Sequence, residues 1–377
     1  MRFEGAMGAR RTRIRLVFSA LTGLVLAISG APAQAREPAA ETFEPSRGDR
    51  GDGRTLGGHT FPRPVFDDSA FLPSSVGFRQ GFFYANAGTV KAQGVDKSVA
   101  MAAAVESLDV TVAFLDWLAI SATGDVQALV GASEVALYSN PSSFGAGVRF
   151  GPVVRALHVE ATGTQIALRP YYQGTFGAIL DVSHVLPSVR ERIENESAAL
   201  PSTPGQAAGR AAVLENDLLS ASVIPLRRSA WGGSLHVAQA MTPYFGVQLS
   251  YDLRRERFLA APYDLVTRRR SEVYLVSVTH TVTASLTFDA SRLHVPVGLS
   301  LEATLAAGTL ASDANQVSVA YDTTVLFGPG LWYTGRKSLQ LGVFVGGQWG
   351  QSAYATFYGP SDSPSTVYGQ FTLRHYF

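Results

Sequence analysis

Apolar and polar residues alternate along most of the chain with a period of two. Between 274 and 288 the even-numbered positions are apolar apart from one histidine, while the odd positions from 277 to 287 are all Ser or Thr. The same alternation covers 293–307, 317–327 and 339–349. Because successive side chains of a strand point to opposite faces, each segment predicts a strand with one apolar and one polar face.

The predicted strands are long, which decides between two all-β architectures. A strand of a globular protein has about 5–6 residues on average, whereas a strand that crosses a membrane needs about 9–11. Long antiparallel strands with one continuous apolar face are typical of a transmembrane β-barrel. A secreted β-sandwich also shows alternation and is the alternative. The strand lengths and the very short turns at one end favour the barrel.

The lengths of the links between strands set the expected strand number. Short links alternate with long ones, as an up-and-down antiparallel barrel requires. We expect about 12 strands, with 10 to 14 as the open range because the first strand has the weakest pattern. The twelve expected strands are 76–88, 98–114, 117–126, 143–157, 164–180, 229–241, 245–256, 271–288, 292–307, 315–333, 337–350 and 365–377.

The last residues of the sequence carry the most specific motif. Phe371, Leu373 and Phe377 share one face of the final predicted strand. This terminal pattern resembles the last strand of Gram-negative outer-membrane β-barrel proteins, although His375 departs from the aromatic or aliphatic residue usual at that step. The resemblance implies insertion into the cell outer membrane. It also implies that the barrel-assembly machinery reads this strand, with Phe377, Leu373 and Phe371 as the assembly signal.

A second motif resembles one subfamily of such barrels. Tyr138-Ser139-Asn140-Pro141 is similar to the Asn-Pro element of the fatty-acid and hydrophobic-compound transporters. In that family the element lies nearer the mature N-terminus, and here it is followed by two serines. Asn-Pro is also common in ordinary turns. If the resemblance holds, it implies hydrophobic substrates that enter through the outer loops.

Aromatic and charged residues follow the expected barrel faces. An aromatic girdle is expected beside the periplasmic ends, formed by Phe114, Trp117, Tyr244, Phe245, Phe288, Trp332, Tyr333, Tyr376 and Phe377. A basic side chain at the lipid midplane costs about 2–4 kcal/mol, so charges should face the lumen. Glu106 is an exception, and His280 lies on the apolar stripe. Ten side chains are expected to line the lumen: Arg79, Asp109, Arg149, Arg155, Arg169, Asp252, Arg254, Glu302, Asp322 and Arg374.

The chain divides into an export signal, a lead-in and the barrel. Residues 1–35 have a basic start, an apolar stretch and an Ala-Gln-Ala end, which predicts a signal peptide cleaved after Ala35. Residues 36–75 read as a flexible periplasmic segment, of which 61–75 could tuck under or into the barrel. The barrel itself spans 76–377. Within it, 181–228 is a long extracellular loop with predicted helices at 189–200 and 206–223. This loop could act as a lid, a plug or a partner-binding element, or it could be a mobile surface loop.

Composition excludes several kinds of chemistry. The chain has 377 residues, of which 46% are hydrophobic and 16% charged, and the formal charge is +1. Nothing in this balance points to nucleic acid. With no cysteine there can be no disulfide, zinc-thiolate site or cysteine nucleophile. No phosphate-binding loop, cofactor motif, metal-ligand cluster or catalytic constellation is visible, and no histidine starts a His-x-Ser element. We therefore expect no cofactor, no metal, no catalytic site and no enzyme.

The expected function is a channel or transporter for an unknown small solute, with the basic excess favouring anionic or polar ones. The alternatives are a closed structural or adhesive barrel without pore activity, and a barrel enzyme. Five arginines fall in one expected extracellular loop: Arg255, Arg257, Arg268, Arg269 and Arg270. They could bridge phosphates of the outer-membrane lipid, or they could be ordinary solvated loop charge.

Overall fold

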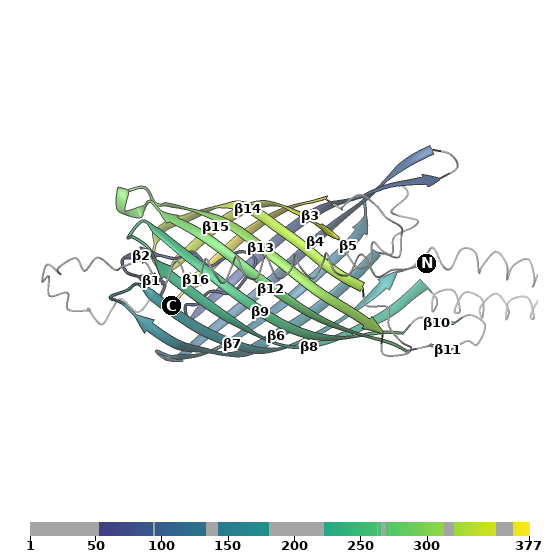
Figure 1. Ribbon diagram of the computed structural model, residues 1–377, viewed down its shortest axis with the longest axis horizontal. Helices are drawn as coiled ribbons and strands as arrows, with labels where there is room; N and C mark the ends of the chain where they lie inside the picture. The colour runs from purple at the N-terminus through teal and green to yellow at the C-terminus, as the bar shows by residue number, and fades with distance from the viewer. Residues whose placement is uncertain are drawn as a thin grey trace, which may run out of the picture. The chain divides into compact units, whose positions relative to one another are not determined.

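Long antiparallel strands close into a single barrel (Figure 1). The computed structural model describes residues 53–92, 95–132, 142–180, 222–261, 263–264, 269–270, 272–312, 320–351 and 365–377. Within these residues the barrel has twelve strands, which confirms the predicted fold class and strand number. The strands are β3 (Ser75–Ala92), β4 (Val95–Leu115), β5 (Leu118–Gly131), β6 (Ser142–Val159), β7 (Thr164–Leu180), β8 (Val223–Ala240), β9 (Phe245–Ala260), β12 (Val273–Asp289), β13 (Val297–Ser312), β14 (Ala320–Arg336), β15 (Leu339–Gln351) and β16 (Ser365–Tyr376).

Each strand pairs with its sequence neighbours, and the first and last strands close the barrel. β16 pairs antiparallel with β3, from Ser365 opposite Asn86 to Tyr376 opposite Ser75. Tight links join β4 to β5 and β14 to β15 at the end where β16 finishes, which we call the short-turn end. The opposite end, which we call the long-loop end, carries a separate two-stranded sheet of β10 (Tyr263–Asp264) and β11 (Arg269–Arg270).

Several strands extend further toward the long-loop end than the sequence pattern indicates, among them β8 and β9. β8 begins at Val223 instead of residue 229, and β9 continues to Ala260 instead of residue 256. Charged residues in these extensions suggested loops, but a strand needs only about 9–11 residues to cross the hydrocarbon, so its remainder tolerates charge. The helix predicted at 189–200 and all but the last two residues of the helix predicted at 206–223 lie outside the described residues. Val223, the last residue of the second helix, begins strand β8 instead. In the described part of the chain, no helix is long and apolar enough to cross a membrane.

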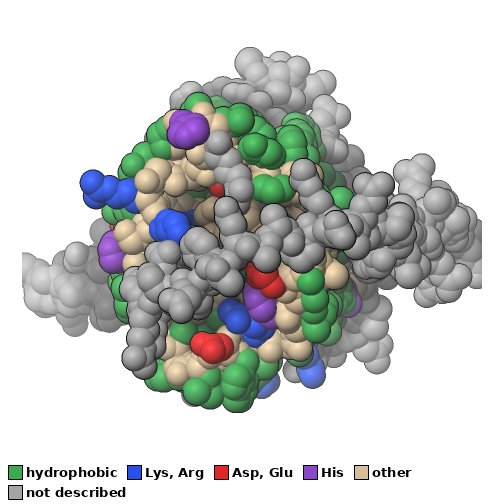
Figure 2. Space-filling model, turned by 90° about the vertical axis from the view of Figure 1, so that its left-hand side faces the viewer, with side chains coloured by type: hydrophobic (Ala, Val, Ile, Leu, Met, Phe, Trp, Pro, Cys, Tyr) green, Lys and Arg blue, Asp and Glu red, His purple; other side chains and the backbone are tan. Residues whose placement is uncertain are grey.

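Burial is reversed relative to a water-soluble protein. Large apolar side chains on the outward face are exposed, including Trp231 at 70% and Phe176 at 65%. Inward-facing polar and charged side chains are buried, including Asp109, Glu302 and Arg374. Figure 2, which faces the short-turn end, shows hydrophobic side chains around much of the periphery. An apolar exterior around a polar interior identifies the chain as a membrane-spanning β-barrel.

The predicted aromatic girdle at the short-turn end is partly corrected. Phe114, Trp117 and Phe377 are exposed on the barrel surface, at 60%, 51% and 59%. Trp332 and Tyr376, however, are 1% and 3% exposed and point into the lumen. Both occupy positions whose immediate neighbours in the strand face outward, so strand alternation turns them inward. They pack the interior instead of contacting lipid.

The two polar exceptions on the apolar face each have a hydrogen-bond partner. Gln80 lies opposite Glu106 across β3 and β4 and donates from Nε2 to Oε1 of Glu106 at 3.3 Å. The Tyr251 hydroxyl and Nδ1 of His280 are 2.8 Å apart. Pairing lowers the cost of placing a polar group against lipid, because each group keeps a partner in place of water.

Candidate functional site

The lumen is occupied at the short-turn end by residues 53–74, which we call the plug segment. It begins with a hairpin of β1 (Thr55–Leu56) and β2 (His59–Thr60), which Figure 1 shows at the end marked C. The backbone amide of Gly57 donates to Oε1 of Glu160, in the turn between β6 and β7, at 3.1 Å. At the other end of the segment, Ser74 Oγ accepts from the amide of Ala113 at 3.0 Å. Both ends of the plug segment therefore lie at the short-turn end.

Apolar contacts fix the middle of the plug segment against one side of the wall. Leu56, Phe61, Phe71 and Leu72 form a buried cluster with four small or branched wall residues. The wall members are Ala119, Val153, Ala167 and Ala238. Gly246 allows the closest approach, because a Cβ there would lie 2.4 Å from the Phe61 ring and 2.5 Å from the His59 ring. The wall is thus shaped to receive these side chains.

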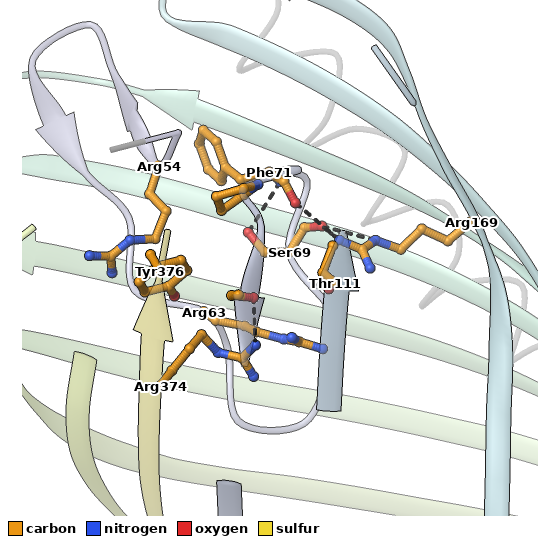
Figure 3. A pocket seen from close by; sticks show the side chains of 10 residues that line it. Arg54, Arg63, Ser69, Phe71, Thr111, Arg169, Arg374 and Tyr376 are labelled. Atoms are coloured by element: carbon orange, nitrogen blue, oxygen red, sulfur yellow. Dashed lines mark hydrogen bonds between the residues drawn. The ribbon is translucent and has the colours of Figure 1, made fainter. Parts of the chain in front are cut away.

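Asp68 is the main ionic anchor of the plug segment. Its Oδ2 lies 3.0 Å from Arg149 Nη2 and 3.8 Å from Arg169 Nη1, and its Oδ1 is bound by Arg63 of the same segment. Arg169 also donates from Nη2 to the carbonyl oxygens of Ser69 at 2.6 Å and Phe71 at 3.1 Å (Figure 3). Wall guanidinium groups therefore grip both a carboxylate and the backbone of the plug segment.

A second ionic cluster forms around Asp109 of β4. Arg374 of β16 binds both carboxylate oxygens of Asp109, with Nη2 to Oδ1 at 2.6 Å. Arg63 of the plug segment donates from Nη1 to Oδ2 at 3.0 Å, and Arg79 Nε lies 3.7 Å from Oδ1. The cluster joins β3, β4 and β16, where the barrel closes, to the plug segment.

Wall side chains on the opposite side of the barrel also form hydrogen bonds with the backbone and side chains of the plug segment. Glu302 Oε2 accepts from the amide of Val65 at 2.8 Å. Gln340 Oε1 accepts from Arg54 Nη1 at 3.1 Å and from the Tyr376 hydroxyl at 2.7 Å. The Arg54 guanidinium lies 4.0 Å from the centre of the Tyr376 ring. Polar contacts thus hold the plug segment from strands on several sides of the barrel.

The two adjacent carboxylates of the plug segment have opposite electrostatic environments. Burial raises the pKa of Asp67 to about 7, and the negative charge of Asp68 contributes to this shift. Burial would also raise the pKa of Asp68, but Arg149, Arg63 and Arg169 together hold it well below its usual value. Near neutral pH, Asp68 is the charged anchor and Asp67 is close to its titration point.

Beyond the plug segment, toward the long-loop end, the described residues line two cavities in the lumen. One has a volume of about 360 Å³ and the other about 150 Å³. Both are lined by Arg228, Arg254 and Glu256. Oε1 of Glu256 lies 3.8 Å from Arg228, and Oε2 lies 3.7 Å from Arg254. The remaining polar lining includes Asp125, Gln127, Gln173, Gln348 and several Ser and Thr residues. Apolar side chains of Phe258, Leu275, Ala306 and Ala307 complete the wall of the larger cavity.

The structure separates the ten expected lumen residues into groups. Seven surround the plug segment or the polar layer next to it: Arg79, Asp109, Arg149, Arg169, Asp252, Glu302 and Arg374. Arg254 lines the cavities, and Arg155 lies near the short-turn end of β6. The side-chain position of Asp322 lies outside what the structure describes.

The sequence pattern missed several residues that build the site. Arg228 fell in the predicted loop 181–228, and Glu256 ended the predicted strand 245–256 without being assigned to the lumen. Arg63, Asp67 and Asp68 precede the first predicted strand. Three aromatic residues close to these charges, at 61, 66 and 71, were the available signal that this segment packs. Among the described residues, no group of three or more His, Cys, Asp or Glu side chains could hold a metal ion.

Comparison with known proteins shows similarity in architecture alone. No family model and no curated protein sequence matches the chain. The translocator domain of the autotransporter NalP from Neisseria meningitidis is 10% identical, with a TM-score of 0.41 over 81% of this chain and 88% of that one. An outer membrane channel from Pseudomonas putida F1 is 9% identical, with a TM-score of 0.41 over 84% and 100%. The toluene transporter TodX from Pseudomonas putida is 10% identical, with a TM-score of 0.38 over 86% and 96%.

Proposed function

We propose that the chain is an outer-membrane channel for small polar solutes whose lumen is closed by the plug segment at the periplasmic side. The short-turn end then faces the periplasm and the long-loop end faces the exterior, as usual for such barrels. Export through the expected signal peptide of residues 1–35 is part of the same proposal. The observation that carries it is a blocked lumen that continues, on the far side of the block, into cavities with charged and polar side chains in their walls.

The cavity walls favour polar solutes without a strong charge preference. Of the charged side chains that line the two cavities, Arg228 and Arg254 are basic, and Asp125 and Glu256 are acidic. The anionic preference expected from the sequence is therefore weak at this level. Ser, Thr and Gln side chains supply hydrogen-bond donors and acceptors that can replace part of a solute's hydration.

Opening requires the plug segment to move, because it fills the lumen between opposite walls. Most of its anchoring contacts are ion pairs and hydrogen bonds, which water can replace once the segment withdraws. The alternative is a permanently closed structural barrel. The number of buried contacts between the plug segment and the wall favours this alternative. The two proposals differ in whether loosening the plug segment creates a path for ions.

Single-channel recording in planar bilayers distinguishes them, with Gly246→Val as the perturbation. The added side chain would overlap the positions of Phe61 and His59, so we expect a higher conductance or more frequent opening than in the wild type. Gly124→Val is the matched control, because a Cβ at Gly124 meets nothing closer than 3.9 Å. Verified insertion of Gly246→Val with no conductance above the wild type, together with a silent wild type, would support the closed barrel.

We also propose that β16 is the strand read by the barrel-assembly machinery. Its outward side chains include Phe371 and Leu373, and Phe377 follows its last residue; all three are exposed. Replacing Phe371 and Leu373 by Ala should reduce the amount of protein assembled in the outer membrane. Replacing two outward residues of β5, Ile120 and Val126, removes similar apolar area and should reduce it less. Equal loss in both variants would contradict a specific role for β16.

A further inference from the structure

The outer surface of β8 and β9 carries arginines on the face that otherwise contacts lipid. Arg227 of β8 and Arg255 and Arg257 of β9 are exposed. Each has the same strand parity as outward apolar residues such as Trp231 and Leu253, which are 70% and 41% exposed. Their direct neighbours Arg228 and Arg254 face the lumen instead. We call Arg227, Arg255 and Arg257 the basic outer patch.

Strand length places the basic outer patch at the outer boundary of the hydrocarbon. β9 begins at Phe245, whose exposed ring marks the periplasmic girdle. Counting about 9–11 residues for a membrane crossing, β9 leaves the hydrocarbon close to Arg255. β8 is antiparallel to β9 and ends at Ala240 at the short-turn end. Counting the same number of residues back from Ala240 places the outer boundary of the hydrocarbon near Trp231, and Arg227 lies beyond it. A guanidinium on the lipid face is costly at the midplane and is tolerated near the interface.

An aromatic row lies next to the patch and marks the same boundary. Phe150, Tyr172 and Trp231 are successive register partners on β6, β7 and β8, and Trp231 is paired with Arg255. The Tyr172 and Trp231 rings lie 4.8 Å apart. Tryptophan and tyrosine favour the level where hydrocarbon meets the head groups. Arg255, the register partner of Trp231, is thus next to this level, while opposite Arg227 the outward ring of Phe176 continues the apolar face of β7.

The inward and outward arginines differ in their pairing. Arg228 and Arg254 both approach Glu256 in the lumen. In the part of the chain that the structure describes, no carboxylate forms an ion pair with Arg227 or Arg255. Arg257 lies 4.7 Å from the centre of the Tyr274 ring, whose hydroxyl donates to Glu272 at 2.5 Å at the edge of the patch.

The β10–β11 sheet adds positive charge beside the patch. Arg269 and Arg270 are exposed, and Arg270 Nη1 donates to the carbonyl oxygens of Val223 at 3.1 Å and Ala261 at 2.9 Å. These contacts join β11 to the start of β8 and the end of β9. The two arginines of β11 therefore lie near the strand ends that carry the basic outer patch.

From this placement we infer that the basic outer patch binds the phosphate groups of a phosphorylated glycolipid in the outer leaflet, with Arg227 and Arg255 as the principal contacts. Guanidinium matches phosphate oxygens with paired hydrogen bonds, and the aromatic row lies along the acyl chains of the same lipid. The site faces the membrane and is separate from the lumen, so it rests on the orientation proposed above but does not depend on channel activity.

Native mass spectrometry of the detergent-solubilised full chain, titrated with lipid A, tests the inference. The double variant Arg227→Gln/Arg255→Gln should bind lipid A about 30-fold more weakly, the change that corresponds to about 1 kcal/mol for each of two basic groups near a charged surface. The matched control Arg228→Gln/Arg254→Gln removes the same charge from the adjacent lumen-facing positions. It should keep the wild-type affinity.

Three outcomes would overturn the inference. Equal weakening in both double variants would show that net charge alone attracts the lipid. Displacement of lipid A by inorganic phosphate at similar concentration would indicate a simple anion site instead of a lipid site. Equal affinity of the wild type for lipid A and for uncharged phosphatidylcholine would show that the phosphates are not recognised. Far-ultraviolet circular dichroism confirms that each variant retains the barrel, so a loss of binding can be assigned to the patch.

Discussion

Asp68 offers the most direct test of how the plug segment is held. The Asp68→Asn substitution keeps the shape of the side chain and removes its charge. Arg149 and Arg169 of the wall then lose their anionic partner at 3.0 and 3.8 Å, while both guanidinium groups stay in the occupied lumen. When the segment withdraws, water hydrates them, so the substitution destabilises the seated state specifically.

The magnitude follows from the geometry of these two pairs. At an effective dielectric constant of about 20, charges about 4 Å apart attract by about 4 kcal/mol. Removing one partner of a buried pair costs about 3–5 kcal/mol. Arg63 belongs to the same segment as Asp68, so their ion pair does not contribute to the free-energy difference between the seated and withdrawn states. We therefore expect Asp68→Asn to destabilise the seated state by about 3 kcal/mol. Since about 1.4 kcal/mol corresponds to a factor of ten, the population with the segment withdrawn should rise about 100-fold.

The absence of cysteine from the natural sequence provides the assay. Ser69→Cys places a single thiol at a position that is 7% exposed. When opening and closing are fast relative to modification, the rate of maleimide labelling follows the withdrawn population. Asp68→Asn in this background should label about 100-fold faster, and Asp125→Asn, which removes a lumen carboxylate above the plug segment, should change the rate little. Labelling of Asp68→Asn within twofold of the parent would refute the ionic anchoring.

Three further predictions address the interior, the pH dependence and the lipid face. Trp332→Ala should lower the free energy of unfolding by about 3–5 kcal/mol, because the indole is buried and donates to Ser300 at 2.8 Å. Urea titration in detergent measures this loss, and the outward control Leu331→Ala should lose only about 1 kcal/mol. Burial in the seated segment raises the pKa of Asp67 to about 7, from 3.8 for an ordinary Asp. Between these two pH values, Asp67 binds a proton when the segment is seated and releases it when the segment withdraws. The Asp67 contribution should therefore slow labelling of the engineered thiol, normalised to a fully exposed cysteine, as the pH falls from about 8 to about 5. It is measured as the difference in slope between the parent and Asp67→Asn, and equal slopes would contradict it. Glu106→Leu should stabilise the barrel by about 1 kcal/mol in bilayers, since a carboxylate on the lipid face is unfavourable, and an unchanged or lower unfolding free energy would place Glu106 outside the hydrocarbon.

Strand alternation predicted the barrel well because its physical cause is local. The solvent changes from lipid on one face to polar lumen on the other, so every strand carries the signal by itself. Strand β7 matches the expected range 164–180 at both ends. Boundaries at the long-loop end were less accurate, as Val223 and Ala260 show, because strands there leave the hydrocarbon and lose the constraint that produces the alternation.

The plug segment was difficult to predict for the opposite reason. Its contacts join residues distant in sequence, such as Val65 with Glu302 and Arg54 with Gln340, and no periodicity accompanies such pairing. The parity rule identified Asp109 and Arg374 as inward residues, but it carries no information about which inward charges meet. That depends on the stagger of the strands around the closed barrel and on the path of a segment with little regular structure.

The path of the plug segment determines how the barrel can be assembled and regulated. The segment enters and leaves the lumen at the same end, where Gly57 contacts Glu160 and Ser74 contacts Ala113. It is therefore a loop pushed into the barrel and is not a strand threaded through it. Strands β3 and β16 can pair before or after the loop is seated, and the loop can withdraw without unzipping that seam. Gly53 lies against Pro73, so the two ends of the loop are neighbours, and the loop can leave the lumen toward the short-turn end while the barrel stays closed.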